Sequence, residues 1–199
     1  MKLISEYCAA VLAGGGSTRM GTDKASLSLG NSTVEERVIR ELYSLTSKVV
    51  LNKKDSLDVQ LPTISDVYEN AGPLGGLQAV MEIRKEEWFI VSACDTPFIK
   101  KAVYQYLTNF INDQRQAIIP IYNGRFQPLS GLYHKSVYPE LVSLLERGDR
   151  KVGKLLDRVH TYYVEDFGDL RTSDLDLHFF NMNTPDDYQK AKEIAKNLA

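Results

Sequence analysis

Apolar residues occur along the chain in two patterns, short continuous runs and runs with helical spacing. A continuous run bounded by glycine or polar residues is typical of a buried strand, whereas apolar residues three or four positions apart are typical of a helix. The continuous runs predict strands at residues 8–13, 48–52, 61–65, 88–93, 116–121 and 160–164. Because strands and helices alternate, we predict an α/β fold with a mostly parallel sheet and right-handed crossovers.

Two helices carry clear start signals. Thr33 is followed three positions later by Glu36, a capping box that opens a helix over residues 32–45. Thr184 is followed by proline and two acidic residues, which opens a last helix that runs to about residue 196. Spacing alone predicts the other helices, at residues 75–84, 101–111 and 137–147.

The second half of the chain contains a hairpin signal. The dipeptide at residues 123–124 is Asn-Gly between two strand-like runs, which favours a type I′ turn. We therefore expect a small hairpin excursion over residues 116–134, and we also expect residues 179–183 to be strand-like. A chain of 199 residues without a repeat or a long linker fits one domain.

A glycine-rich loop follows the first strand, and residues 12–24 read L-A-G-G-G-S-T-R-M-G-T-D-K. Glycines let a backbone approach a ligand closely, and successive N–H groups in such a loop form a concave site for anions. Arg19 and Lys24 add two cations, which suits a polyphosphate. The spacing fits neither the P-loop nor the dinucleotide-binding fingerprint. We predict a nucleotide-phosphate loop, and an ordinary turn is the alternative.

Asp95 follows the most apolar run in the chain, at residues 88–93. Ligands of open α/β sheets bind at the carboxyl ends of central strands. A carboxylate there suits Mg²⁺, which usually takes one or two carboxylates together with substrate phosphates. The other interpretation is that Asp95 caps the next helix, because Pro97 stands near a helix start.

A glycine pair at residues 75–76 and a basic loop at residues 148–154 each allow a structural or a functional interpretation. Gly75 and Gly76 stand at a predicted helix start, where glycine lowers helix propensity. A close approach of the backbone to a ligand or a neighbouring strand would explain them, and so would tight packing of the helix on the sheet. Residues 148–154 form a basic loop, which is usually a solvated turn and is here a candidate second anion site.

Composition narrows the classes of function. The net charge of −2 argues against a general grip on nucleic acid. No apolar run approaches a membrane span, and the N-terminus lacks a signal-peptide pattern. Cys8 and Cys94 lie in apolar runs, so we expect buried free thiols in a reducing cytoplasm. The three histidines lack ligand spacing, which argues against zinc.

The glycine loop is one of five motifs that together resemble the molybdenum cofactor guanylyltransferases. The loop and the C-D-T-P-F motif are the most specific, since related cytidylyltransferases usually lack the Asp-Lys pair and have glycine in place of the cysteine. The resemblance implies a three-layer α/β/α Rossmann-like nucleotidyltransferase fold in one domain, with a GTP-binding part over about residues 1–112 and a pterin side over about 113–199. The motifs span residues 12–24, 65–66, 72–77, 94–98 and 181–185.

The same resemblance implies roles for individual residues. Arg19, Lys24 and Asp95 would be catalytic: Arg19 on the departing pyrophosphate, Lys24 on the GTP phosphates, and Asp95 on Mg²⁺ and GTP. The nucleotide would further contact Leu12, Ala13, Gly14, Gly15, Asn52 and Asp66. The pterin substrate would lie near Asn181 and Asn183 and, on weaker grounds, near Arg150 and Lys151.

The implied reaction transfers GMP from GTP to molybdenum-loaded molybdopterin and releases pyrophosphate. A phosphate monoester, whose second pKa is about 6, is largely dianionic at neutral pH, so the attack requires no general base. The site must instead position the groups and stabilise charge. Mg²⁺ is the expected cofactor. The substrates, GTP and molybdopterin, are the expected partners, with neither nucleic acid nor membrane and with transient contacts to other molybdenum cofactor proteins.

We expect a cytoplasmic monomer or weak oligomer. Two other functions stay open at this point. The first is CTP-dependent cytidylyl transfer to the same cofactor, and the second is a non-catalytic nucleotide-binding regulator. The presence of Arg19, Lys24 and Asp95 together argues against the regulator.

Overall fold

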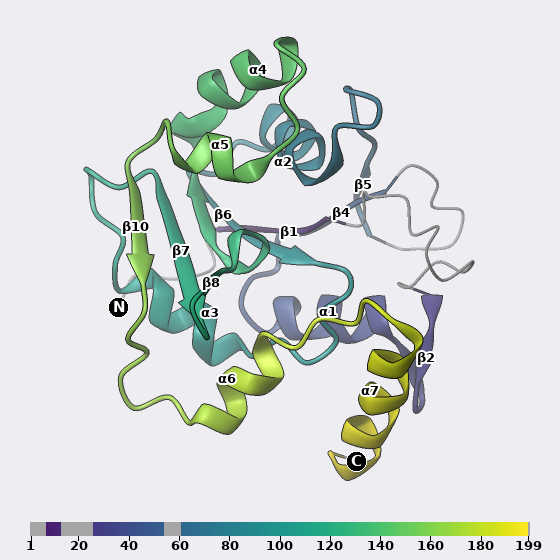
Figure 1. The fold of residues 1–199 in the computed structure, drawn as a ribbon. Coiled ribbons are helices and arrows are strands. Elements are labelled where there is room, and N and C mark those ends of the chain that lie inside the picture. Colours follow the sequence, from purple (N-terminus) through teal and green to yellow (C-terminus); the bar gives the residue numbers. More distant parts are fainter. Residues whose placement is uncertain (1–6, 13–25, 54–60, 199) are drawn as a thin grey trace.

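An eight-stranded sheet lies at the centre of the computed structural model, which describes residues 7–12, 26–53 and 61–198 (Figure 1). The strand order is β10-β7-β9-β6-β1-β4-β5, with β8 paired to β7. The strands are β1 (Cys8–Leu12), β4 (Val49–Asn52), β5 (Thr63–Ile64), β6 (Trp88–Ala93), β7 (Ala117–Tyr122), β8 (Arg125–Phe126), β9 (Leu132–His134) and β10 (Thr161–Val164). A separate two-stranded sheet pairs β2 (Ser28–Leu29) with β3 (Ser32–Thr33).

Most of the sheet is parallel, as predicted. Strand β1 pairs in parallel with β4 on one side and with β6 on the other, and β4–β5 and β7–β10 are also parallel. Only β8 and β9 run antiparallel to their neighbours among the strands of this sheet that the structure describes. The chain moves outward from β1 to β4 and β5 and then crosses back to β6, which places the switch point between β1 and β6.

Helices cover both faces of the sheet, which confirms the three-layer prediction (Figure 1). Along β1, Cys8, Ala10 and Leu12 pack into one apolar cluster, and Ala9 and Val11 pack into a second on the other face. The first face is covered by α2 (Gly72–Ile83), α4 (Tyr138–Glu146) and α5 (Val152–Leu156), and the second by α1 (Val34–Tyr43), α3 (Lys101–Thr108) and α6 (Thr172–His178). Helix α7 (Pro185–Asn197) packs beside β2.

Both predicted helix starts are confirmed. The Glu36 carboxylate accepts the Thr33 N–H at 2.7 Å, and the Glu36 N–H donates to Thr33 Oγ1 at 3.2 Å. Thr184 forms the matching box with Asp187 at the start of α7. Helix α2 differs from the prediction because it begins at Gly72 rather than Gly75. A proline is tolerated in a first helical turn, where its missing N–H has no intrahelical partner to lose.

The predicted hairpin is present as β7–β8, with positive φ at Asn123 (49°) and Gly124 (69°), as a type I′ turn requires. The chain then forms a short 3₁₀ turn (Pro128–Ser130) and returns as β9 into the sheet, between β6 and β7. Gly131 allows this return, because a Cβ there would lie 2.7 Å from Ile119 Cδ1 and 2.8 Å from the Ile118 carbonyl oxygen. Strands β7 and β9 are therefore members of the main sheet.

The predicted strand at residues 179–183 is wrong. The sequence analysis also missed α6, which ends at His178 immediately before this segment. The Met182 N–H donates to the Asp95 carbonyl oxygen at 2.9 Å instead of joining a ladder of strand hydrogen bonds. Phe180 and Met182 pack against Phe98 and α7. Their alternating apolar pattern therefore reflects a loop lying over a core, not a strand.

A buried histidine ties three distant segments together. His178 is fully buried, and its Nδ1 accepts the Lys100 N–H at 2.8 Å. Its Nε2 lies 2.6 Å from Ser130 Oγ. Because Nδ1 accepts a hydrogen bond, the neutral ring carries its proton on Nε2 and donates it to the serine. Burial lowers the pKa of His178 to about 3, so the folded protein holds this ring neutral.

We expect His178 to make the protein lose stability on acidification. Its pKa in the folded state lies below the unfolded value of about 6.5, so the unfolded chain binds more protons between these two values. Stability is therefore lost as the pH falls through this window, by at most about 1.4 kcal/mol per pH unit from this one group. In the variant His178→Gln, the glutamine amide can form hydrogen bonds in place of those of the imidazole, but it does not take up a proton in this pH range.

The free energy of unfolding is measured by urea titration of both proteins at several pH values between about pH 7 and about pH 5. The free energy of unfolding should fall more steeply in the wild type than in His178→Gln. Parallel curves for the two proteins would contradict a neutral, buried His178.

Candidate active site

The register of three parallel strands places a row of residues at one edge of the sheet. Leu12 at the end of β1 is the partner of Asn52 in β4 and of Ala93 in β6. The Cys94 N–H donates to the Leu12 carbonyl oxygen at 3.3 Å, and Asp95 follows directly. Because the switch point lies between β1 and β6, this edge is where a ligand of an open α/β sheet binds. The structure thus brings Leu12, Asn52 and Asp95 to one edge.

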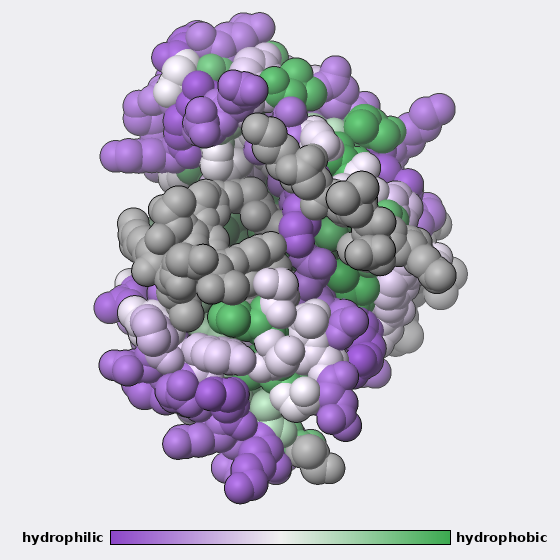
Figure 2. Space-filling model, turned by 90° about the vertical axis from the view of Figure 1, so that its right-hand side faces the viewer, coloured by the Kyte–Doolittle hydropathy of each residue, from purple (hydrophilic) through white to green (hydrophobic). Residues whose placement is uncertain are grey.

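The surface around this side of the molecule is uneven in character. Figure 2 shows it turned toward the viewer, with hydrophilic residues at the top and bottom of the view and near-neutral and apolar residues just above the lower hydrophilic area. Most of the predicted glycine loop lies outside the described residues. The roles of Ala13, Gly14, Gly15, Arg19 and Lys24 therefore stay predictions, and the structure places only Leu12, at the start of the loop.

Asn52 and Asp66 form a directly bonded pair. The Asn52 side chain is 1% exposed, and its Nδ2 donates to Asp66 Oδ1 at 2.7 Å and to the Ile64 carbonyl oxygen at 3.0 Å. These two acceptors fix the amide orientation. Asn52 Oδ1 is buried and has no hydrogen-bond partner among the described residues. An unsatisfied buried acceptor costs about 1–3 kcal/mol, so this oxygen is suited to a donor supplied by a ligand.

The paired glycines of α2 are explained by close packing. A Cβ at Gly76 would lie 2.2 Å from Asn52 Oδ1 and 3.3 Å from Leu12 Cδ2. A Cβ at Gly75 would lie 2.5 Å from the Ala71 side chain. Gly76 is therefore explained by close packing of α2 on strands β1 and β4, whereas Gly75 packs against the segment that precedes the helix. The contact still concerns the site, because Gly76 packs directly on Asn52.

Asp95 lies in the turn between β6 and α3. The alternative that it caps α3 is wrong, because the N-cap residue is Lys100. Thr96 Oγ1 donates to the Ala93 carbonyl oxygen at 2.8 Å, and the Asp95 carbonyl oxygen accepts from Met182. These bonds fix the turn at both ends and hold the half-buried Asp95 at the carboxyl edge of the sheet.

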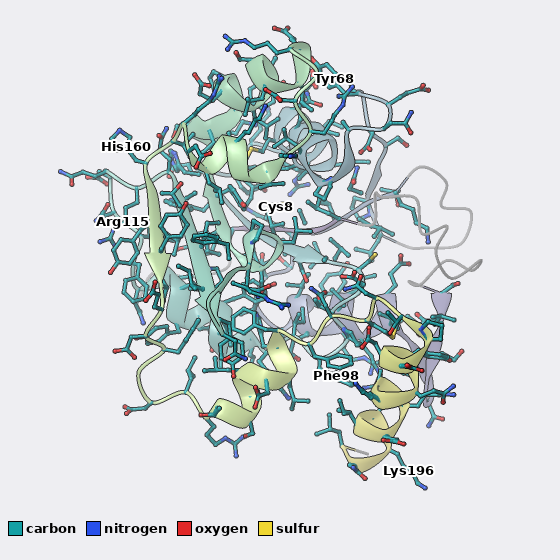
Figure 3. All side chains as sticks on the ribbon, viewed as in Figure 1. Cys8, Tyr68, Phe98, Arg115, His160 and Lys196 are labelled. Atoms are coloured by element: carbon teal, nitrogen blue, oxygen red, sulfur yellow. The ribbon has the colours of Figure 1, made fainter. Side chains whose placement is uncertain are left out.

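The bond from Met182 also brings Asn181 and Asn183 to this edge. Met182 is buried, whereas the two asparagines on either side of it are exposed. Residues 180–182 pack against Phe98, whose ring centroid lies 5.8 Å from that of Phe180. Figure 3 labels Phe98 near the connection between α6 and α7. The two asparagines thus flank the backbone that binds Asp95.

Arg150 and Lys151 are placed elsewhere. They are exposed in the connection between α4 and α5, on the face of the sheet that α2 covers (Figure 1). Within the described ranges, neither makes a hydrogen bond or ion pair to Asp95 or to residues 181–183. Lys154 in the same loop pairs with Asp149. The structure therefore does not join this basic loop to the other site residues, and its role stays a prediction.

Cys8 is buried, as expected, whereas Cys94 is only half-buried, and the two form no disulfide within the described ranges. In the part of the chain that the structure describes, no helix has the length and apolar character needed to cross a membrane. Sequence reasoning missed the contact of Gly76 with Asn52 and the hydrogen bonds of His178. A glycine pair opening a helix, after a strand that ends in asparagine, was the available signal for the first.

The fold and the site define the class of protein. A mostly parallel sheet with a switch point between β1 and β6, a glycine-rich sequence after β1 and a carboxylate after β6 is the arrangement of α/β nucleotide-binding proteins. Residues 9–162 match the family model described as the MobA-like NTP transferase domain. The chain belongs to this family, which confirms the resemblance found in the sequence.

Individual relatives match over nearly the whole chain. The probable molybdenum cofactor guanylyltransferase of Halalkalibacterium halodurans is 36% identical over 189 residues, which cover 89% of this chain and 93% of the relative. That of Bacillus cereus strain G9842 is 32% identical over 202 residues, 98% of this chain and 100% of the relative. The crystal structure of molybdopterin-guanine dinucleotide biosynthesis protein A from Archaeoglobus fulgidus matches with a TM-score of 0.83 at 27% identity, covering 96% of this chain and 99% of that chain.

We predict that Gly76→Ala destabilises the protein by about 1–3 kcal/mol, because the added methyl group overlaps the hydrogen-bonded Asn52 amide. Combining it with Asn52→Ala should relieve the overlap. The double variant should then lose less stability than the sum of the two single variants, by about 1 kcal/mol in urea unfolding.

Gly153→Ala is the matched control. Gly153 lies in helix α5 with no atom within 4 Å of the added Cβ, so this change should be neutral or slightly stabilising. If the losses of unfolding free energy in Gly76→Ala and Asn52→Ala are strictly additive in the double variant, the proposed steric overlap between the two side chains is wrong.

Proposed function

We propose that this protein transfers a GMP moiety from GTP to molybdenum-loaded molybdopterin, forming the guanine dinucleotide cofactor and releasing pyrophosphate. The observation that carries the proposal is the row at the sheet edge, where Leu12, Asn52 and Asp95 come together from three strands. Near full-length relatives that bear the name molybdenum cofactor guanylyltransferase support the choice of substrates.

The Asn52–Asp66 pair is the proposed contact for the base. Guanine presents adjacent N–H donors on its N1 and N2 edge, whereas cytosine presents one amino donor beside a ring acceptor. The pair offers a carboxylate and the buried Asn52 Oδ1, both of which accept. An acceptor-rich site matches two donors and leaves the cytosine ring nitrogen facing an acceptor, which favours GTP over CTP.

Asp95 is the proposed Mg²⁺ ligand. The described residues contain no group of three or more histidine, cysteine or acidic side chains that could hold a metal by themselves. Asp95 at a ligand-binding edge fits an ion that takes one or two carboxylates and completes its shell with substrate phosphates and water. When bound there, Mg²⁺ would neutralise charge on the phosphate oxygens.

The chemistry is an in-line displacement. An oxygen of the terminal phosphate of molybdopterin forms a bond to the α-phosphorus of GTP as the bond to the β-phosphate oxygen breaks, and pyrophosphate leaves. The attacking phosphate is largely dianionic at neutral pH, so no proton must be removed from it. The protein therefore has to align the two substrates, with Asn52 and Asp66 on the base, and Asn181 and Asn183 on the acceptor.

Arg19 is the proposed contact of the pyrophosphate and Lys24 that of the GTP phosphates. Arg150 and Lys151 are secondary proposed contacts of the acceptor. We also propose that the protein acts in the cytoplasm, as a monomer or weak oligomer. The free state of Cys8 fits a reducing compartment.

We expect pyrophosphate release and a guanine dinucleotide product when the purified protein receives GTP, Mg²⁺ and molybdenum-loaded molybdopterin. The kcat/KM for GTP should exceed that for CTP by about 100-fold, because the acceptor-rich base contact rejects cytosine. Chromatography and mass spectrometry identify the dinucleotide product and measure its rate of formation from GTP and from CTP. Selectivity for CTP would overturn the base assignment, and tight GTP binding without product would identify a regulator instead.

Asp95→Asn should lower kcat on the order of 10²–10³-fold, because an amide is a poor ligand for a hard cation and loses the negative charge. The backbone bond from Met182 does not depend on the side chain, so the fold should persist. The control is Asp113→Asn, the same change at an exposed residue after α3, which should keep full activity. Near-normal kcat in Asp95→Asn would remove Asp95 from the metal site.

A further inference from the structure

A pocket lies where β7 turns into β8, facing helix α6. Its volume is about 390 Å³, within the range of small-molecule sites. In Figure 1 strand β7 ends near α6. The Tyr122 hydroxyl donates a hydrogen bond to Asp176 of α6 and so joins the two elements. The lining residues are Tyr122, Asn123, Arg125, Gln127, Asp176 and Phe179. We call this the β7–α6 pocket.

One wall of the β7–α6 pocket contains two aromatic side chains, those of Tyr122 and Phe179. The rings of Tyr122 and Phe179 are stacked, with centroids 4.8 Å apart and planes inclined by 24°. Phe167 supports both rings from the side, at centroid distances of 6.3 Å and 5.7 Å. Such a surface favours contact with a planar ring system.

The polar groups of the pocket present both donors and acceptors. Tyr122 Oη donates to Asp176 Oδ1 at 2.7 Å, which orients the carboxylate. Asp176 Oδ2 and the side chains of Arg125 and Gln127 make no hydrogen bond to another described residue. One carboxylate and one guanidinium beside an aromatic wall suit a neutral, hydrogen-bonding heterocycle better than a phosphate, which the carboxylate would repel.

A short segment of the chain, from Phe179 to Met182, connects the β7–α6 pocket to the candidate active site. Phe179 in its wall precedes Met182 by three residues, and the Met182 N–H binds the Asp95 carbonyl oxygen. Three extended residues span at most about 11 Å, so the pocket wall lies within one small molecule's length of the Asp95 turn. Asn181 lies between these two points in the sequence.

The same wall is rigidly anchored. His178, the neighbour of Phe179, binds Lys100 at the end of the Asp95 turn and Ser130, which lies three residues after Gln127. The two sides of the pocket and the Asp95 turn are therefore held by one buried ring. A ligand that bridges the pocket and Asp95 would meet a preformed surface, which lowers the ordering cost of binding.

We propose that the β7–α6 pocket holds the pterin end of the acceptor substrate, with the phosphate end directed past Asn181 toward Asp95. This inference rests on the proposed function for the identity of the acceptor. A pterin is planar and carries a 2-amino group beside a ring N–H, two donors that one carboxylate accepts as a pair. Asp176 is the acceptor for that edge, and Arg125 and Gln127 are the donors for the ring oxygen and nitrogens.

The test compares two substitutions on one helix. Asp176→Asn removes the paired acceptor, and the KM for molybdopterin should rise about tenfold or more, with the KM for GTP unchanged. Asp174→Asn is the matched control, because Asp174 lies in α6, pairs with Arg171 and more distantly with Lys100, and does not line the pocket. It should leave both KM values unchanged. Arg125→Gln is a second pocket variant, remote from the buried contacts of α6, and should also raise only the acceptor KM.

Binding of 6-carboxypterin, followed by its own fluorescence, gives a readout that does not require turnover. Wild type and Asp174→Asn should bind this probe, and Asp176→Asn should bind it about tenfold more weakly. If wild type performs guanylyl transfer while Asp176→Asn keeps both its acceptor KM and its affinity for the probe, the pocket proposal is overturned and the proposed function stands. If the probe binds through Asp176 but wild type transfers nothing from GTP, the pterin pocket is supported and the proposed function fails.

Discussion

The parallel pairing of β1 with β4 and β6 is the constraint on which the site depends. It sets Leu12 opposite both Asn52 and Ala93, so that Asn52 and the Asp95 turn come to opposite sides of one short strand. Every residue of β1 is buried, and its side chains alternate between two apolar clusters. A slip by one residue would exchange these clusters and move the whole row, so burial of both faces fixes the register.

Two sets of contacts complete the site from outside these strands. Helix α2 packs Gly76 against Asn52 and so helps to fix the amide that donates to Asp66. The segment after α6 binds the Asp95 turn through Met182, while His178 binds the end of that turn and the 3₁₀ turn before β9. Under the proposed function, the nucleotide side and the acceptor side would therefore meet at Asp95, which is the arrangement that in-line transfer between two bound substrates requires.

Local signals in the sequence predicted much of the fold. The capping boxes, the continuous apolar strands and the Asn-Gly turn each depend on neighbouring residues, and each is present. The insertion of β9 between β6 and β7 depends on contacts far apart in the chain, so no local pattern revealed it. Phe180 and Met182 alternate as in a strand because a loop over a core buries every second residue too. For the candidate site, the family resemblance predicted Asn52, Asp66 and Asp95, and their roles stay predictions, while the contact of Gly76 with Asn52 required the fold.

A crystal structure of the protein with GTP and Mg²⁺ would test the central claim most directly, namely that the strand register builds a guanine nucleotide site at this edge. We predict that the guanine N1 and N2 donors lie within hydrogen-bond distance of Asp66 and Asn52, and that a metal ion joins Asp95 to the phosphates. A base bound away from Asn52, or phosphates with no contact to Asp95 through the metal, would contradict the account.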